Sequence, residues 1–228
     1  MNTTSESRNS KPRPASILVW DLPVRVFHWA MVICFAGAWL TAESERQRLL
    51  HVAFGYTLAG LVAFRVLWGF VGTRHARFAA FVRGPRALAG YLRGLWSGTP
   101  PHCVGHNPAG GWAILALLAL AVAVAASGIV TYQEWLGDGF EEVHEVAASL
   151  MLLVVGVHVV GVLASSRLHH ENLVAAMFSG RKHGLPADGI GSARNVLGAA
   201  LLCSALGFWV WQAWPPEAPA VEAAAEQR

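Results

Sequence analysis

The stretch HEVAASLMLLVVGVH, from His144 to His158, has a histidine at each end of an apolar run with no charged residue after Glu145. The two histidines are 14 residues apart, which is about 21 Å along a helix that rises 1.5 Å per residue. At about 100° per residue this separation falls roughly 40° short of four full turns, so both imidazoles point to nearly the same helix face. Ionisable side chains are rare and costly inside a membrane, so the arrangement indicates a function.

The overall composition predicts an integral membrane protein. Hydrophobic residues make up 54% of the 228-residue chain and charged residues only 14%, whereas an ordinary soluble domain carries about 25% charged residues. The apolar runs leave no room for a soluble catalytic domain. The three cysteines form neither CxxC nor CxxCH, which argues against a redox dithiol and against covalent attachment of a c-type haem.

Five segments are long and apolar enough to cross a bilayer as helices. Only helices are plausible, because the backbone must satisfy its own hydrogen bonds in lipid and these runs do not alternate as barrel strands do. We therefore predict an all-α integral membrane fold, a four-helix transmembrane bundle with a fifth, C-terminal transmembrane helix. The predicted spans are residues 26–42, 49–71, 112–133, 146–166 and 195–216.

The charges predict the orientation. Most Lys and Arg residues precede the first span or lie between the second and third or the fourth and fifth, and only Arg46, Arg48 and Arg228 lie on the opposite side. By the positive-inside rule, the N-terminus is cytoplasmic and the C-terminus is outside. Most acidic residues fall on the outer side. They form either a solvated rim or a docking surface for a basic partner.

The predicted depths place four histidines in two pairs. His28 begins the first span on the cytoplasmic side and pairs in depth with His158 (the inner pair), while His51 begins the second span on the outer side and pairs with His144 (the outer pair). Each pair fits bis-histidine ligation of a haem iron. Arg65 follows His51 by 14 residues, so it lies at the depth of the inner pair, where a haem propionate would explain a buried charge.

Other interpretations of the same residues remain open. A single histidine near a span end is usually interfacial or hydrogen-bonded between helices, but four at two matched depths favour metal ligation. A histidine-based metal-ion transporter would use acidic residues and three or four ligands, and only Glu145 stands at the margin of a span. A haem-free membrane anchor for a soluble enzyme would leave the matched depths unexplained.

The glycines of the spans and the histidines of the loops lead to two further predictions. Glycines within the spans are available as clearance for a planar cofactor, although glycine is common in membrane helices in any case; they are Gly37, Gly55, Gly60, Gly156 and Gly161. Six histidines fall in the cytoplasmic connections, where we expect exposed side chains; they are His75, His102, His106, His169, His170 and His183.

The chain resembles the bacterial di-haem cytochrome b561 family, which includes the b-type cytochrome subunit of nickel–iron hydrogenases. The resemblance covers roughly residues 18–183 and departs from the four-helix pattern in the added fifth span. It rests on VWDLPVRVFHW (19–29), RVLWGFVGTRHARF (65–78), GHNPAGGW (105–112), the His144/His158 pair and ENLVAAMFSGRK (171–182). It implies two b haems, the inner ligated by His28 and His158 and the outer by His51 and His144.

The resemblance also implies electron transfer across the bacterial inner membrane between the quinone pool and a periplasmic or membrane redox partner. The expected partners are membrane lipid, quinone, and a c-type cytochrome, hydrogenase or dehydrogenase. Nucleic acid is not expected, a homodimer is compatible with the sequence, and quinone-linked oxidoreductase activity is left open. The expected organisation is a disordered cytoplasmic tail (1–17), the di-haem domain (18–183), a linker with the fifth helix (184–214) and a disordered outer tail (215–228).

Overall fold

The computed structural model of the chain describes residues 15–99, 101–136 and 139–213. It confirms the all-α membrane fold, because this part of the chain holds five helices long and apolar enough to cross a bilayer. The last residues of the expected fifth span, 214–216, lie outside the described residues. The five helices are α1 (Leu22–Thr41), α2 (Arg48–Val71), α5 (Pro108–Tyr132), α6 (Gly139–Leu168) and α8 (Asn195–Ala213).

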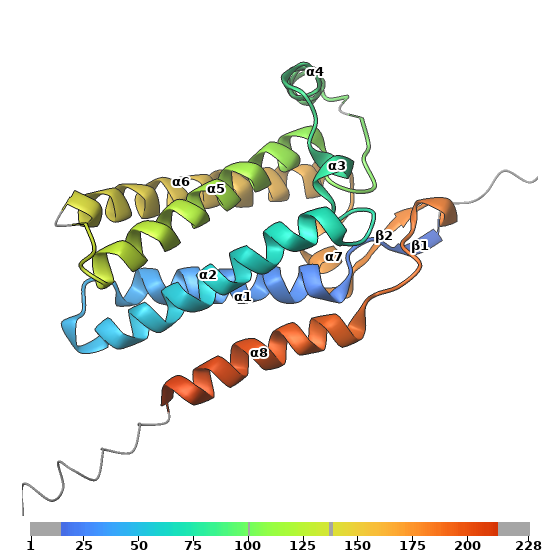
Figure 1. Cartoon of the computed structure of the whole chain (residues 1–228). Coiled ribbons are helices and arrows are strands. Elements are labelled where there is room, and N and C mark those ends of the chain that lie inside the picture. Colours follow the sequence, from blue (N-terminus) through green and yellow to red (C-terminus); the bar gives the residue numbers. More distant parts are fainter. Residues whose placement is uncertain (1–14, 100, 137–138, 214–228) are drawn as a thin grey trace, which may run out of the picture.

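Four of these helices form a bundle and the fifth lies outside it. Helices α1 and α2 form one antiparallel hairpin, α5 and α6 form another, and α2 packs on α5 to join the two (Figure 1). Helix α8 packs on α1, on the side away from α5 and α6 (Figure 1). The buried core of the bundle consists of Cys34, Leu58, Leu61, Val62, Ala121, Val124, Ala147 and Met151.

Helices α1 and α5 begin earlier than their apolar runs, and each start is capped by a side chain. Helix α1 begins at Leu22 rather than at residue 26, because the Asp21 carboxylate accepts a hydrogen bond from Val24 N at 2.8 Å and caps the first turn. Helix α5 begins at Pro108, where Asn107 Oδ1 accepts from Gly110 N at 2.7 Å. In both helices a proline stands in the first turn, where its missing N–H costs nothing.

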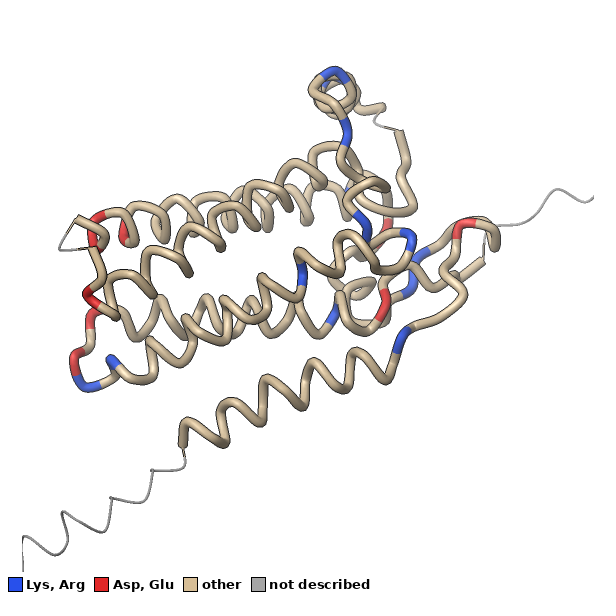
Figure 2. The backbone as a smooth tube through the Cα atoms, viewed as in Figure 1, with Lys and Arg blue, Asp and Glu red and all other residues tan. Residues whose placement is uncertain are grey.

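The two ends of the bundle carry opposite charges (Figure 2). We call the end formed by residues 42–47 and by the facing ends of α5 and α6 the acidic end, and the end formed by residues 15–21, 72–107 and 169–194 the basic end. The acidic residues described at the acidic end are Glu43, Glu45, Glu134, Glu141, Glu142 and Glu145. A short 3₁₀ turn, η1 (Glu45–Gln47), links α1 to α2 there.

The basic end is a folded cap that the sequence did not predict. Strand β1 (Ala15–Leu18) pairs antiparallel with β2 (Arg181–Gly184). The expected boundaries at 17/18 and 183/184 therefore both cut through this sheet, and residues 15–17 do not belong to a disordered tail. The remaining cap elements are α3 (Phe78–Phe81), α4 (Pro85–Trp96), α7 (Leu173–Ser179) and the 3₁₀ turn η2 (Pro186–Asp188).

Helix α4 lies across the bundle axis at the basic end and is seen end-on in Figure 1. It buries Tyr91 against the protein but exposes Leu92, Leu95 and Trp96. A helix with exposed apolar side chains and arginines at the rim of a membrane bundle is typical of an interfacial helix. The feature is consistent with a bilayer surface at this level.

A buried carboxylate joins the cap to the bundle. Asp21 is completely buried, and besides capping α1 it accepts from Trp68 Nε1 of α2 at 3.1 Å and from Thr73 Oγ1 at 2.5 Å. Three donors satisfy one charge, which is the condition for burying a carboxylate without a large penalty. The start of α1 and the end of α2 are thus fixed to each other.

We predict that Asp21→Ala destabilises the protein by about 2–4 kcal/mol, because it removes a helix cap and leaves buried donors unpaired. Detergent-solubilised protein unfolded by heat or by increasing dodecyl sulfate gives the measurement. Glu43→Ala, an exposed carboxylate at the acidic end, is the matched control. Equal unfolding midpoints for the two variants would show that the contacts of Asp21 do not stabilise the protein.

Candidate functional site

The imidazoles of the outer pair lie side by side between α2 and α6. The ring centroids of His51 and His144 are 6.1 Å apart and the ring planes make an angle of 77°. His51 Nδ1 lies 2.9 Å from the Ala38 carbonyl oxygen of α1, and His144 Nδ1 lies 3.0 Å from the Val124 carbonyl oxygen of α5. Since each Nδ1 donates its proton to a carbonyl, each Nε2 keeps a free lone pair.

This spacing is compatible with two imidazoles that share a metal ion. Two metal–nitrogen bonds of about 2.0 Å, together with the half-widths of two rings, place the ring centres roughly 6 Å apart. The carbonyl contacts at Nδ1 fix the ring orientation and raise the basicity of the ligand, as is usual for metal-bound histidine. The residues of the outer pair therefore fit an iron held between them.

The inner pair joins α1 to α6 toward the basic end. His28 and His158 are both partly buried and lie within electrostatic range of each other. His28 packs edge-on against Trp29, at 5.0 Å between ring centroids, and its Nδ1 is buried without a hydrogen-bond partner. A buried imidazole with an unmatched nitrogen is costly unless another group engages the ring. The inner pair thus lacks the carbonyl contacts of the outer pair.

The apolar core separates the two pairs. Met151 stands seven residues from both His144 and His158, and Leu58 stands seven residues from His51. At about 1.5 Å per residue, both side chains lie midway between the pairs. Both belong to the buried core of the bundle. The site is therefore a pair of polar layers, one toward each end, with an apolar layer between them.

The glycines expected to give clearance divide into two groups. A methyl group added at Gly55, Gly60, Gly156 or Gly161 would meet no atom within 4 Å, so open space lies beside each of them. Gly37 is different, because an added methyl group would overlap the ring of Phe54 on α2. Gly37 therefore serves the close packing of α1 on α2 and is not available as cofactor clearance.

Arg65 is a buried cation whose hydrogen bonding is incomplete. Its side chain is 3% exposed, and its guanidinium lies over the rings of Phe78 and Phe81 at 5.4 and 5.9 Å. Its Nη2 donates to the Ala76 carbonyl oxygen at 3.1 Å, but Nη1 is buried without a partner. No carboxylate of the described residues lies within ion-pairing distance of it. Such a group fits an anion that the described residues do not supply.

The six loop histidines do not all lie at the surface. His102, His170 and His183 are exposed, as expected, while His75 and His169 are partly buried. The prediction is wrong for His106, whose ring packs against Trp20 and Phe81 at 4.5 and 4.9 Å between centroids. Burial, reinforced by nearby cations, lowers the pKa of His106 to about 3, so this imidazole is neutral at physiological pH.

Sequence reasoning also missed Gly128 on α5. A methyl group added there would come within 2.9 Å of His144 Cε1, so a glycine at this position lets the imidazole lie against the α5 backbone. The neighbouring Ser127 Oγ lies 3.4 Å from His144 Nδ1. The sequence carries no signal for this contact, because it depends on how α5 packs against α6.

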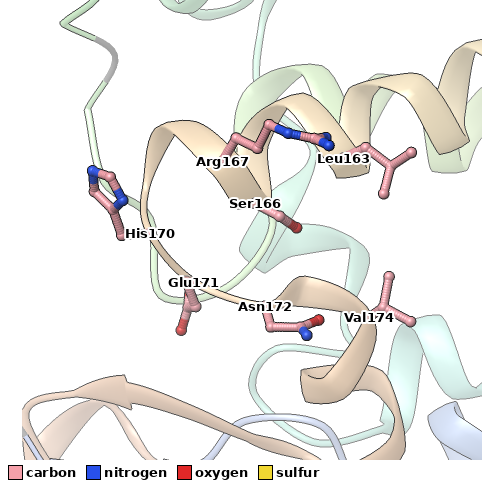
Figure 3. A pocket seen from close by; sticks show the side chains of 7 residues that line it. All are labelled: Leu163, Ser166, Arg167, His170, Glu171, Asn172 and Val174. Carbon is pink, nitrogen blue, oxygen red and sulfur yellow. The ribbon is translucent and has the colours of Figure 1, made fainter.

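A pocket at the basic end is a separate feature. It has a volume of about 450 Å³ at the basic end, where α6 leads into α7, and contains none of the paired histidines (Figure 3). Its walls combine apolar, polar and charged groups; they are Leu163, Ser166, Arg167, His170, Glu171, Asn172 and Val174. The described residues also hold no cluster of three or more His, Cys, Asp or Glu side chains suited to a metal ion. Paired histidines suit a haem iron, whose other four ligands belong to the porphyrin.

The sequence model of the prokaryotic cytochrome b561 family matches residues 19–180. Among curated proteins, the chain is 29% identical over 164 residues to a probable Ni/Fe-hydrogenase B-type cytochrome subunit of Azotobacter chroococcum, covering 60% of this chain and 68% of that protein. A protein of the same description from Rhizobium leguminosarum is 25% identical over 213 residues, covering 73% and 89%. A probable Ni/Fe-hydrogenase 1 B-type cytochrome subunit of Escherichia coli is 26% identical over 143 residues, covering 51% and 60%.

No solved structure matches the chain. The family match spans all five pieces of sequence on which the resemblance rests, apart from the last residues of the fifth. The chain belongs to the prokaryotic cytochrome b561 family. It is a membrane protein of this bacterial family, and its function is transmembrane electron transfer through b haem.

We predict that Gly128→Leu displaces His144 and removes the haem of the outer pair while the haem of the inner pair remains. The expected result is half the wild-type haem absorbance per polypeptide. Gly207→Leu on α8 is the matched control, because a methyl group added at Gly207 would meet no atom within 4 Å. An unchanged haem content in Gly128→Leu would contradict the placement of His144 as a ligand.

Proposed function

We propose that the chain carries electrons across the membrane through two bis-histidine b haems, the inner ligated by His28 and His158 and the outer by His51 and His144. The observation that carries the proposal is the outer pair, with ring centroids 6.1 Å apart and both Nδ1 atoms engaged by carbonyl groups. The inner pair supports the proposal in two ways. His158 lies on the same face of α6 as His144, and His28 has a buried nitrogen without a hydrogen-bond partner.

The residues of the chain have distinct roles in this proposal. Haem iron supplies reversible one-electron chemistry, and two histidine ligands leave no coordination position for oxygen or substrate. The carbonyls of Ala38 and Val124 hold the outer imidazoles in their ligating tautomer. The apolar layer around Leu58 and Met151 keeps water from the space between the pairs. Arg65 Nη1, its unpaired donor, would hold a propionate of the inner haem.

The charges of the two ends support an orientation. Lys and Arg residues gather at the basic end, and the positive-inside rule puts that end in the cytoplasm (Figure 2). Helix α8 runs from the basic end to the acidic end (Figure 1), so the C-terminus would then lie outside the bacterial inner membrane. The interfacial helix α4 is consistent with a membrane surface at the basic end.

The proposed electron partners are a lipid-soluble quinone and a redox protein. The printed names of the relatives make a hydrogenase the first candidate for the protein partner. The carboxylates of the acidic end would attract a partner with a basic docking face, such as a c-type cytochrome, and would raise the rate of encounter at low salt. A dehydrogenase is a further candidate for the redox protein partner.

Proteoliposomes test the proposal directly. Wild-type protein should pass electrons from an added quinol to ferricyanide trapped inside the vesicles, and the haem bands should be reduced on the way. His144→Ala and His158→Ala should each keep one haem per chain and abolish the transfer. His183→Ala, which changes an exposed imidazole, should behave as wild type.

Transfer that persists in both ligand variants would contradict the proposal. A haem-free anchor would show no haem bands in any variant. A histidine-based transporter would instead accumulate metal ions in the vesicles in a His158-dependent manner.

A further inference from the structure

Two buried nitrogen atoms without partners lie together at the basic end. Arg65 Nη1 and His106 Nδ1 are both sealed from solvent and have no hydrogen-bond partner. Both side chains pack against the ring of Phe81, the guanidinium at 5.9 Å and the imidazole at 4.9 Å from its centroid. More than nine in ten buried polar groups are paired in native proteins. An unpaired guanidinium donor and an unpaired imidazole nitrogen around one ring therefore indicate a hydrogen-bonding group that the described residues do not supply.

The nearby acceptors and cations of the cap are already engaged. The Asp21 carboxylate accepts from three donors and is not within ion-pairing distance of Arg65. Lys182 Nζ pairs with Glu171 at 3.0 Å and donates to the Cys103 carbonyl oxygen at 3.3 Å. Arg65 Nη1 and His106 Nδ1 thus have no partner among these groups, and both side chains lie against Phe81.

The position of these donors relates them to the inner pair. His106 directly precedes Asn107, the N-cap of α5, and lies within electrostatic range of both Arg65 and His158. Arg65 follows His51 by 14 residues on α2 and therefore lies near the depth of His158. The two donors thus lie at the edge of the inner pair on its basic-end side.

We propose that His106 and Arg65 together bind the propionate carboxylates of the inner haem, with His106 acting as a positioning residue for that cofactor. The inference rests on the proposed function, because it requires a haem between His28 and His158. A carboxylate has two oxygens that accept several hydrogen bonds, so it can satisfy an arginine and an imidazole at once. Trp20 and Phe81 hold the imidazole ring in place from two sides.

The proposal has a consequence for the redox potential of one haem. A propionate charge favours the oxidised iron, and donors that offset this charge favour the reduced iron. Removing the His106 donor should therefore lower the midpoint potential of the inner haem. The outer haem, on the far side of the apolar layer, should keep its potential.

The test uses three variants of the haem-loaded protein in detergent. His106→Phe keeps an aromatic ring between Trp20 and Phe81 but removes both nitrogens, whereas His106→Gln restores a donor. His183→Phe removes an exposed imidazole of β2 and is the control. Haem content is measured first by the pyridine haemochrome method, and each haem is then titrated potentiometrically.

His106→Phe should shift the reduced-to-oxidised ratio of the inner haem several-fold toward oxidised, on a scale where tenfold is 59 mV for a one-electron couple. The outer haem should be unchanged, His106→Gln should recover most of the shift, and His183→Phe should show none. Selective loss of the inner haem in His106→Phe, with recovery in His106→Gln, would also support the proposal.

Equal shifts of both haems, no shift, or a His106→Gln variant as defective as His106→Phe would overturn it. These outcomes differ from failure of the proposed function itself. In that case the wild-type protein would carry no haem before any variant is compared.

Discussion

An imidazole inside a membrane has to satisfy two nitrogen atoms where no water is at hand, and this constraint organises the bundle. In the outer pair one nitrogen of each ring is satisfied, because each Nδ1 donates to a backbone carbonyl of a neighbouring helix. This contact requires α1 to lie close to α2 and α5 to lie close to α6, which is how the two hairpins pack. The remaining Nε2 atoms belong to rings whose centroids are 6.1 Å apart, and the proposed function gives them one haem iron to share.

In the folded cap at the basic end, buried charged side chains likewise need hydrogen-bond or ion-pair partners. Asp21, Lys182 and Arg65 are all buried, and the first two are satisfied by neighbouring groups of the cap. Arg65 is not, and neither is His106 beside it. These two unpaired side chains lie at the edge of the inner pair. The proposed function places a carboxylate-bearing cofactor at that edge.

The sequence predicted the helices and the depth of the histidines well, because both depend on local pattern. Apolar runs of sufficient length have no other stable structure in lipid, and a 14-residue spacing fixes two side chains on one helix face. The early start of α1 was also readable, since Asp21 and Pro23 form a cap and first-turn pattern in the sequence. The ligand roles of the four histidines and of Arg65 remain proposals.

The cap depends on contacts between distant residues, and no local pattern predicts it. Strand β1 has only four residues, and its partner lies far along the chain, between Arg181 and Gly184. His106 is partly buried because Trp20 and Phe81 contact it from separate segments. Gly128 matters only because His144 lies against it across α5 and α6. Each of these follows from tertiary packing.

The central claim is that the two histidine pairs hold two b haems. The most direct measurement is the ratio of haem to polypeptide in purified wild-type protein, from the dithionite-reduced minus oxidised spectrum with pyridine haemochrome quantification. A b-type α-band and two haems per chain are the expected result. Protein without haem absorbance, purified from cells that make their other cytochromes normally, would contradict it.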